Sequence, residues 1–542
     1  MIDKQPPGEP SPASASSAAA APDAAGAVSP METKLAQLRE RQARAREMGG
    51  PDGLVRHRQS GRLPVRERIA MLIDEDSWFE IGALGLPELR TARHVPGDAV
   101  VTGFARLDGR RIGLIGIDSS VLAGTTAPTS MRKQGRLIEQ AQRCGFPIVL
   151  LCDADGGRIP DVMGWRFSHL PLDFRTFVKS PEGQPPVPRA AAILGPSYGD
   201  SALHASTAHF VVMVRTGAVA LSGPSVVQAA LAQDITDQQL GGPAAATAAG
   251  NALMVVDDEQ QAMNAIAAFL SYVPANASLP APVAPPRAPA RDPDELMSLV
   301  PTESKCGYDM VRVLEAIVDE GSLLPWGADW GPSLICALAR IEGHPVGIVA
   351  NQPIVGAGAL DPAALRKEHD FVHLCDTFNL PLVFLHDVPG LLIGMDAERN
   401  GILRAYEQLV SRLADARVPK IGIVIRKAYG GGHFAMGGRP TCPSFQFAWP
   451  TAEMGFMAPE AGVQTVYRRR LETVAREEGE AAAERLAAQL EQEWITESEP
   501  WEAAAHLALD DVIEPARTRA VIAASIDIAW GERASRVTGR WG

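Results

Sequence analysis

An internal duplication constrains the fold of this chain more than any other feature of its sequence. The segment FARLDGRRIGLIG at 104–116 matches LARIEGHPVGIVA at 338–350, and GFPIVLLCDADGG at 145–157 matches NLPLVFLHDVPGL at 379–391. The members of both pairs lie 234 positions apart, whereas VPRAAAILGPSYGD and VPKIGIVIRKAYGG, which begin at Val187 and Val418, lie 231 apart. Three matched blocks in the same order indicate two copies of one structural unit.

Each copy has the same order of apolar runs and helical stretches. A helical stretch such as 130–143 precedes a short apolar run, 148–151 in the first copy and 382–385 in the second. A second apolar run, at 190–194 and 421–425, ends in a turn of small residues that opens a helix. Fully apolar runs that alternate with helices are typical of buried parallel strands. We therefore expect an α/β layer fold.

Two low-complexity segments predict the domain boundaries. Residues 1–31 are rich in Pro, Ala, Ser and Gly and cannot bury enough apolar surface to order themselves, so they predict a disordered tail. The proline- and alanine-rich run 274–296 has no apolar periodicity and predicts a semi-rigid linker. We expect an N-terminal domain at 32–273 and a C-terminal domain at 297–542, since 542 residues exceed what one core usually holds.

Composition and charge exclude several classes of function. With 51 basic and 64 acidic side chains the formal charge is −13, which disfavours a nucleic-acid-binding surface. The six cysteines form no CxxC pair, and the histidines show no metal-ligand spacing, so no metal is expected on this chain. The most apolar stretch, 210–232, is interrupted by Arg, Gly and Pro and does not predict a membrane span. Scattered cysteines and the lack of a signal sequence favour a cytoplasmic location.

The turns that carry chemistry lie at equivalent points of the two copies. One pair is 153–158 (DADGGR) and 387–390 (DVPG), and the other is 197–200 (SYGD) and 428–432 (AYGGG). Glycines at a helix start leave backbone N–H groups free and let a carbonyl approach closely, which suits an oxyanion hole. In any single turn the glycines can instead serve only a tight βα connection. Four such turns at equivalent points favour two related oxyanion holes.

Longer motifs connect the sequence to a known family. They include GRLPVRERIAMLID from Gly61, GDAVVTGFARLDGR from Gly97, and, in the second copy, LCDTFNLPLVFLHDVPG, VPKIGIVIRKAYGGG and FAWPTAEMGFMAPEAGV. With these motifs the chain resembles the carboxyltransferase (beta) subunits of propionyl-CoA, methylcrotonyl-CoA and acetyl-CoA carboxylases and the related glutaconyl-CoA-type decarboxylases. The resemblance implies two duplicated crotonase-like ββα domains. It also implies active sites between the N-terminal domain of one copy and the C-terminal domain of another, in a hexamer built from dimers.

The same resemblance implies a set of site residues. Backbone N–H groups of Gly430, Gly431 and Gly432 would bind the carbonyl oxygen of biotin, and Gly431 is expected to need a backbone conformation that a Cβ would strain. Gly199 and Asp200, with Gly156 and Gly157, would hold the thioester carbonyl. The remaining candidates lie around these two holes: Arg158 beside the CoA or carboxylate group, Arg132 and Lys133 near the CoA phosphates, Gly390 and Tyr429 on the biotin side, His433 as a wall residue, and Phe434 in the acyl pocket.

Two of these assignments have structural alternatives. Arg158 can belong to a structural ion pair, and Arg132 with Lys133 can lie on a solvated helix face.

The partners follow from the resemblance as well. The carboxyl donor would be carboxybiotin on a separate carrier protein, and the acceptor an acyl-CoA thioester. The chain has neither a Met-Lys-Met biotinylation sequence nor a GxxxxGK[ST] loop, so we expect it to carry no biotin and to consume no ATP. Biotin carboxylase and biotin carrier subunits are then the expected partners.

One substitution sets this chain apart from the family pattern. Relatives carry a GPCAGGA-like turn where this sequence has GPSYGDSA, so that Asp200 replaces a glycine, and the stretch 165–188 is also atypical. A carboxylate beside a hole meant for an anion should oppose enolate formation. Two alternatives therefore stay open: a decarboxylase or specialised carboxyltransferase for an unusual acyl thioester, and a non-catalytic scaffold subunit. The sequence specifies neither the acyl group nor the direction of transfer.

Overall fold

The structure is a computed structural model that describes residues 29–89, 95–178 and 180–539. The N-terminal half contains α1 (Pro30–Ala45), α2 (Gly50–Gln59), α3 (Val65–Leu72), β1 (Phe79–Ile81), β2 (Val100–Leu107), β3 (Arg110–Ile117), α4 (Pro128–Cys144), β4 (Ile148–Asp155), α5 (Phe174–Val178), β5 (Arg189–Tyr198), α6 (Asp200–Ser206), β6 (Phe210–Val214), β7 (Ala218–Ala220), α7 (Pro224–Leu231), α8 (Asp237–Gly241), α9 (Pro243–Ala248), β8 (Met254–Val256) and α10 (Glu259–Tyr272).

The C-terminal half repeats this order and then adds helices. It contains α11 (Leu296–Leu299), α12 (Met310–Glu315), β9 (Leu324–Pro325), β10 (Leu334–Ile341), β11 (His344–Asn351), α13 (Pro362–Thr377), β12 (Leu382–Val388), α14 (Met395–Arg399), α15 (Ile402–Asp415), β13 (Lys420–Tyr429), α16 (Gly430–Ala435), β14 (Phe445–Ala448), β15 (Glu453–Gly455), α17 (Pro459–Val466), α18 (Arg468–Glu478), α19 (Glu480–Ser498), α20 (Pro500–Ala505), β16 (Asp511–Val512) and α21 (Thr518–Gly539).

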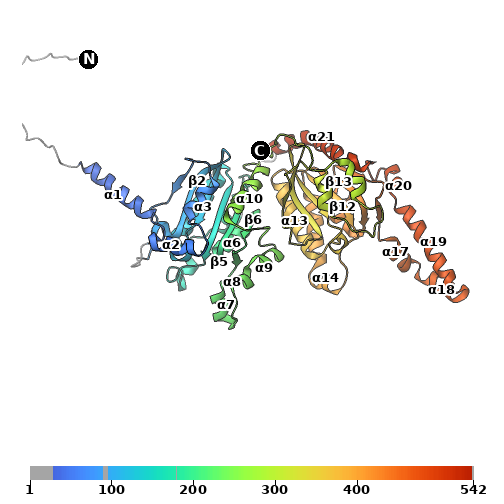
Figure 1. The fold of residues 1–542 in the computed structure, drawn as a ribbon, viewed down its shortest axis with the longest axis horizontal. Helices are drawn as coiled ribbons and strands as arrows, with labels where there is room; N and C mark the ends of the chain where they lie inside the picture. The colour runs from blue at the N-terminus through green and yellow to red at the C-terminus, as the bar shows by residue number, and fades with distance from the viewer. Residues whose placement is uncertain (1–28, 90–94, 179, 540–542) are drawn as a thin grey trace, which may run out of the picture. The chain divides into compact units, whose positions relative to one another are not determined.

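Each half folds around one mixed sheet, and the two sheets have the same topology (Figure 1). The strand order is β1-β2-β3-β4-β5-β6-β8 in the first and β9-β10-β11-β12-β13-β14-β16 in the second, with β7 beside β5 and β15 beside β13. The hairpins β2–β3 and β10–β11 are antiparallel, and the strands that follow pair in parallel. The α/β expectation and the duplication are therefore confirmed.

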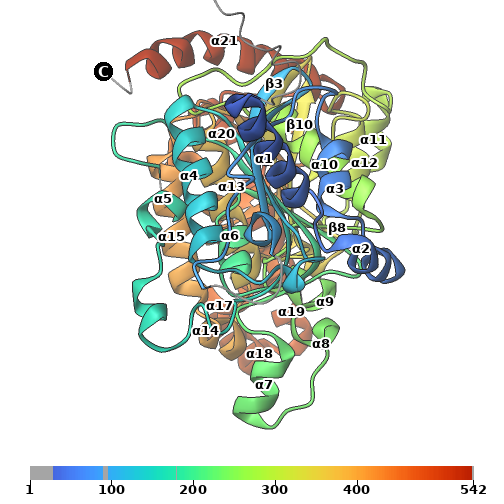
Figure 2. The same ribbon diagram turned by 90° about the vertical axis from the view of Figure 1, so that its left-hand side faces the viewer.

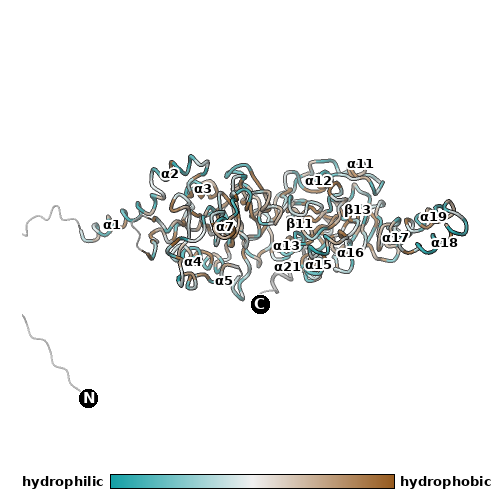
Figure 3. The backbone as a smooth tube through the Cα atoms, turned by 90° about the horizontal axis from the view of Figure 1, so that it is seen from below, coloured by the Kyte–Doolittle hydropathy of each residue, from teal (hydrophilic) through white to brown (hydrophobic). Residues whose placement is uncertain are grey.

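The apolar runs form strands because both faces of each sheet are covered. Every residue of β12 is buried, and so is every residue of β4 except the last, Asp155. In Figure 3 many apolar segments lie among the strands, whereas α18 is mostly hydrophilic. In both halves the register shifts near the carboxyl end of the central strand pair, at Asp153 between β4 and β5 and at Asp387 between β12 and β13.

The two halves share one hydrophobic core. Side chains of α10 such as Phe269 belong to the same buried cluster as Trp326 and Phe371 of the C-terminal half. The Trp326 indole N–H donates to the His209 carbonyl across the two halves, at 3.0 Å. Such a continuous apolar contact ties the two sheets together.

The segment that follows α10 connects the halves along the surface of the second one. Residues 274–292 contain no helix or strand apart from an isolated bridge at Pro289. The segment nevertheless packs against the rest of the protein, because Ala277 and Ala281 are buried and the Asn379 side-chain amide donates to the Ala277 carbonyl. The domain boundaries inferred from composition remain a prediction.

Residues 1–44 and 45–542 form two separate units. In the first unit, residues 1–28 of the expected disordered tail lie outside the described residues, and α1 begins at Pro30, inside the range assigned to that tail. In the second unit, α7 projects away from the sheets without a buried residue of its own (Figures 1 and 2). Within the described ranges, no helix has the length and apolarity that crossing a membrane requires.

Candidate active site

The predicted glycine turns lie at the carboxyl ends of adjacent parallel strands, and in each half they meet. In the N-terminal half a Cβ added to Gly199 would lie 3.4 Å from Gly156 Cα. In the C-terminal half a Cβ added to Gly432 would lie 2.9 Å from Gly390 Cα. Such close backbone approach is possible because these residues lack side chains. The structure thus brings together the two turns of each half that the sequence paired.

The glycine that requires an unusual backbone is not the one expected. Gly430, with φ of +54°, takes the left-handed conformation, as does its counterpart Gly199 with φ of +65°. Gly431 does not, so the expected strain at Gly431 is wrong. The atoms nearest to an added Cβ at Gly431 belong to the Leu391 and Tyr406 side chains, at 3.2 and 3.3 Å, so these side chains would have to shift slightly. Gly432 is the tight position, because its Cβ would lie 2.8 Å from Val388 Cγ2.

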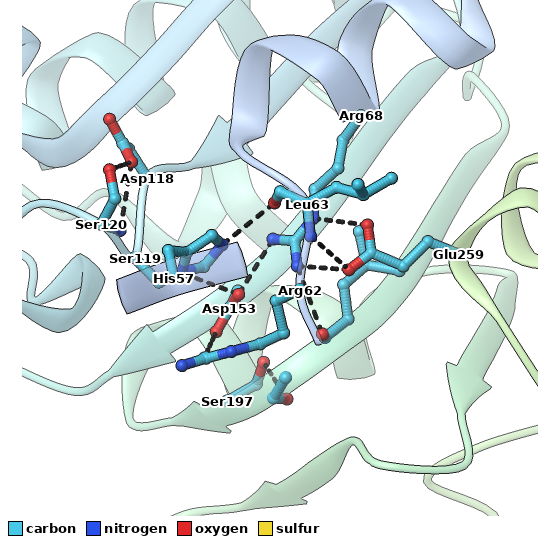
Figure 4. Close-up of polar contacts among 12 residues, drawn as sticks. His57, Arg62, Leu63, Arg68, Asp118, Ser119, Ser120, Asp153, Ser197 and Glu259 are labelled. Carbon is cyan, nitrogen blue, oxygen red and sulfur yellow. Dashed lines mark hydrogen bonds and ion pairs between the residues drawn. The ribbon is translucent and has the colours of Figure 1, made fainter. Parts of the chain in front are cut away.

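A buried ion-pair network holds the N-terminal turn (Figure 4). The Asp153 carboxylate accepts from Arg68 at 2.9 Å, from Arg62 at 2.8 Å and from the Ser119 hydroxyl at 2.7 Å. Arg68 also donates to both oxygens of Glu259, on α10. The network therefore ties Asp153, at the register shift before Gly156, to α3 through Arg68 and to α10 through Glu259. A buried guanidinium with this many charged partners meets the condition under which burying charge is tolerated.

A different cation holds the C-terminal turn. The Asp387 carboxylate accepts from Arg426, on the neighbouring strand β13, at 2.9 Å. Lys427 lies 3.3 Å from the other oxygen of Asp387. The Arg426 guanidinium also stacks over the Tyr308 ring at 4.7 Å and donates to three backbone carbonyls. Asp153 and Asp387 could be matched from the sequence, but their arginine partners, Arg68 and Arg426, could not.

Asp200 begins α6 and packs against the N-terminal turn. Its Oδ1 accepts a hydrogen bond from the Thr126 hydroxyl at 2.7 Å, while its Oδ2 is shielded from solvent and has no hydrogen-bond partner. The Thr126 backbone N–H donates to the Gly156 carbonyl at 2.9 Å. Asp200, Thr126 and the glycine turn therefore form one contact group. Thr126 was not anticipated, since nothing in the sequence marks it.

Arg158 is engaged in an ion pair. Its guanidinium bonds the buried Asp98 carboxylate and the Thr125 carbonyl, and the side chain is 5% exposed. These contacts agree with the alternative that Arg158 forms a structural ion pair, and they leave its guanidinium facing the protein interior.

Lys133 is buried rather than placed on a solvated face. Its Nζ donates to the carbonyls of Gly97 and Val100. Lys367, at the equivalent position of the second half, donates to the carbonyls of Gly327, Gly331 and Leu334. Burial lowers the pKa of Lys133 to about 8. The same contacts in both copies indicate a structural role, so the solvated-face alternative is wrong for Lys133. Its neighbour Arg132 is exposed and pairs with Glu88.

A pocket of about 650 Å³ opens beside the C-terminal turn. It is lined by Tyr429, Pro389, Lys427 and Lys305 among others. The Tyr429 hydroxyl bonds the Glu453 carboxylate, and burial together with this contact raises the pKa of the phenol. Four glutamates, Glu303, Glu453, Glu460 and Glu491, line the same pocket, so its two lysines do not give it a net positive charge. Lys305 pairs with Glu460, and Lys427 with Asp387. The lysines were not singled out in the sequence, although Lys427 belongs to the RKAYGGG motif.

The residues that follow Gly432 have distinct environments. His433 is largely buried, and burial lowers its pKa to about 4, so the imidazole is neutral. It packs against His386, with ring centroids 5.5 Å apart. Phe434 is exposed. No group of three or more His, Cys, Asp or Glu side chains capable of holding a metal ion occurs within the described ranges.

Comparison with known proteins gives the family of the chain. Residues 56–540 match the family model for the carboxyl transferase domain. The chain is 33% identical to the carboxyltransferase subunit of propionyl-CoA carboxylase from Haloferax mediterranei, over 93% of this chain and 98% of that protein. It is 35% identical to the beta4 subunit of a biotin-dependent long-chain acyl-coenzyme A carboxylase from Mycobacterium tuberculosis, over 91% and 94%.

A solved structure has the same architecture. The chain superposes on transcarboxylase 12S, described as a hexamer assembly with methylmalonyl-coenzyme A bound, with a TM-score of 0.86 and 33% identity over 93% of this chain and 96% of that one. The duplicated α/β fold that the resemblance implied is therefore confirmed, and it is consistent with two crotonase-like domains. With a family model covering most of its length and relatives at one-third identity, the chain belongs to the carboxyl transferase domain family.

Proposed function

We propose that the chain is the carboxyltransferase subunit of a biotin-dependent acyl-CoA carboxylase, which moves a carboxyl group between carboxybiotin and the α-carbon of an acyl-CoA. The observation that carries this proposal is the pair of glycine turns at equivalent sheet edges of the two halves. Each turn offers backbone approach to one carbonyl oxygen, and the reaction has two carbonyls to stabilise, one on biotin and one on the thioester.

The two turns have complementary roles in this reaction. Gly430, Gly431 and Gly432 donate to the ureido oxygen of biotin, which gains negative charge as the bond between nitrogen and the carboxyl carbon breaks. The ureido group takes the α-proton of the acyl-CoA, and the α-carbon forms the new bond to the carboxyl carbon. Gly156, Gly157 and Gly199 stabilise the thioester oxygen while that carbon is an enolate. No side-chain base is needed, in keeping with the neutral His433.

The pocket beside the C-terminal turn is the proposed entrance for carboxybiotin. Its lining includes Tyr429 of the turn, and Lys427 is the proposed contact for the carboxylate. Gly390 borders the same turn, and the exposed Phe434 is available to line an acyl pocket. On the CoA side, the exposed Arg132 remains the proposed phosphate contact, whereas Lys133 and Arg158 are held in structural contacts.

The complete site requires a second copy of the chain. Exposed apolar side chains follow both turns in the sequence: Ile159, Met163, Trp165 and Phe167 after the first, and Leu392, Ile393 and Met395 after the second. Exposed apolar residues of this size mark surfaces that become covered. We propose that the N-terminal turn of one copy faces the C-terminal turn of another, within a hexamer built from dimers.

The remaining components act in trans. The proposed partners are a biotin carboxylase and a biotin carrier protein, and the substrates are carboxybiotin and a CoA thioester. A cytoplasmic location is proposed because all six cysteines are unpaired, as in a reducing compartment. The alternative of a specialised decarboxylase or carboxyltransferase rests on Asp200 and the atypical stretch 165–188, and that of a scaffold subunit on Asp200 alone.

An exchange assay tests the function with the chain by itself. Methylmalonyl-CoA labelled in its free carboxyl group is incubated with biotin, and label is measured in carboxybiotin. Transfer that depends on biotin is the expected result. Loss of label as free CO₂ without biotin would favour the decarboxylase, and no loss of any kind would favour the scaffold.

A further inference from the structure

Asp200 is a half-buried residue whose carboxyl group has no counter-ion among the described residues. Oδ1 accepts a hydrogen bond from Thr126 Oγ1, the backbone N–H groups of Asp200 and Ser201 also act on the carboxyl group, and Oδ2 has no hydrogen-bond partner. None of the ion pairs found between described residues includes Asp200. An unpartnered, solvent-shielded oxygen next to a proposed oxyanion hole requires an explanation, since buried polar atoms are generally bonded.

A protonated carboxyl group explains these contacts better than a carboxylate does. A buried negative charge with no cation beside it costs far more free energy than a buried neutral acid. Burial accordingly raises the pKa of Asp200, against smaller opposing effects of Thr126 and nearby backbone N–H groups. With Oδ1 accepting from Thr126, the proton belongs on Oδ2, which then becomes a free hydrogen-bond donor.

The other titratable groups around the turn do not change this assignment. On β4, the Cys152 thiol is neutral, because burial raises its pKa to about 12, and the Asp153 carboxylate is neutralised by Arg68 and Arg62. Asp155, the last residue of β4, is itself shifted toward the protonated form, first by burial and then by Asp237.

The remaining groups, on other elements, are also accounted for. On α6, burial lowers the pKa of His204 to about 4, so it carries no charge near neutrality. In the loop after β4, the Arg158 guanidinium is held by Asp98.

We propose that Asp200 is a protonated acid whose side chain turns its hydroxyl toward the thioester oxygen when the acyl-CoA binds and donates a hydrogen bond to it, beside the backbone donors of the glycine turn. This proposal rests on the proposed function. The acid keeps its proton throughout, and its hydrogen bond strengthens as negative charge develops on the thioester oxygen. A carboxylic acid held neutral by its surroundings can serve an oxyanion hole in this way.

The arrangement is specific to the N-terminal half. The positions equivalent to Asp200 and Thr126 are Gly431 and Leu360, so the biotin-side turn has neither the acid nor the hydroxyl that orients it. Asp200 thus strengthens only the hole for the acyl thioester. As a carboxylate, Asp200 would repel negative charge on the thioester oxygen, whereas as a protonated acid it can donate a hydrogen bond to that oxygen.

The pH dependence of label exchange tests this role. The active form of Asp200 is the protonated one, so kcat/KM for methylmalonyl-CoA should fall as pH rises through the elevated pKa of Asp200. Asp200→Asn supplies an amide donor at every pH, and should keep activity within about tenfold of wild type while losing that alkaline fall. Asp200→Gly removes the donor and should lower kcat on the order of 10²-fold.

Asp108→Asn is the matched control. Asp108 is exposed in the β2–β3 turn, at the opposite end of β3 from the site, and asparagine tolerates its φ of +50°. Its pH profile should match wild type. The proposal is overturned if Asp200→Gly is faster than wild type, as a charged, repelling Asp200 would require, or if Asp200→Asn keeps the alkaline fall.

A binding measurement separates this proposal from the proposed function. Should the wild type exchange no label, the function is wrong, and calorimetry with propionyl-CoA decides the role of Asp200. Affinity should then weaken with rising pH in the wild type and stay level in Asp200→Asn. Equal pH dependence of the two proteins would contradict the hydrogen bond to the thioester.

Discussion

The two halves of the molecule each bury an aspartate beside a glycine turn, but they neutralise it with arginines from different elements. Both place an aspartate at the register shift before the first glycine turn, and both neutralise it with a buried arginine. In the C-terminal half the cation is Arg426, on the adjacent strand. The equivalent position in the N-terminal half is Gly195, where even a Cβ would lie 2.4 Å from Asp153 Oδ1. The cation there comes from α3 instead.

The comparison shows which parts of the repeat are fixed and which have diverged. The backbone geometry of the turns and the buried lysines Lys133 and Lys367 are common to both halves. The side chains around the turns differ, since Asp200 and Gly157 stand at the positions that Gly431 and Leu391 occupy in the second half. A glycine at one position makes room for a side chain at the other. In the proposed function the shared geometry suits a carbonyl oxygen at each turn, and the differences suit the two groups, biotin and the acyl thioester, that carry it.

Removal of the α3 cation should have the largest effect. Arg68→Met leaves Asp153 with Arg62 alone and Glu259 without its buried partner, so it should cost about 3–5 kcal/mol of stability. Denaturant unfolding monitored by circular dichroism measures the loss. Arg215→Met, at an exposed ion pair with Asp257, should change stability by less than about 1 kcal/mol. Equal effects of the two substitutions would contradict the anchoring role.

Transfer of the N-terminal side chain into the C-terminal turn should be the next largest effect. Gly431→Asp places a carboxyl group beside the Leu391 side chain and the Tyr406 hydroxyl, and the position equivalent to Thr126 is Leu360. Label exchange should fall on the order of 10²–10³-fold, because the side chain obstructs the biotin carbonyl. Gly431→Asn obstructs equally but carries no charge, so the ratio of the two rates reports the electrostatic part. Near wild-type exchange in both variants would mean that the C-terminal turn does not bind the reacting carbonyl.

A single methyl group at the diverged strand position should have the smallest effect. Gly195→Ala forces the Asp153 carboxylate away from its cations and should cost about 1–3 kcal/mol. Gly183→Ala, in a turn with open space around it, tests the cost of a Cβ at a strained φ alone. If Gly195→Ala were as stable as the wild type, the space beside Asp153 would not require a glycine. The difference between Gly195 and Arg426 would then not explain why the two halves take their cation from different elements.

The sequence was sufficient to predict the repeat, the strands and the turns, because all of these depend on local apolar patterns that recur in order. It could not predict the cations, since Arg68 lies 85 positions from Asp153 and 191 from Glu259, and no local pattern connects them. Neither the predicted CoA contact of Lys133 nor its solvated-face alternative took account of the backbone carbonyls that the fold brings to it. The φ of Gly431 was mispredicted for a related reason, because which of three consecutive glycines takes the left-handed conformation depends on the neighbouring turn.

Complementation between two inactive variants tests most directly whether both turns form one carboxyl-transfer site. Gly157→Val blocks the N-terminal turn and Gly431→Asp the C-terminal one, and neither glycine has a left-handed backbone, so both variants should fold and assemble. Co-expressed at equal levels, they should recover about a quarter of wild-type label exchange, because half of the dimers are mixed and each mixed dimer has one intact site. A mixture as inactive as either variant alone, in oligomers of wild-type size, would contradict a site shared between two chains.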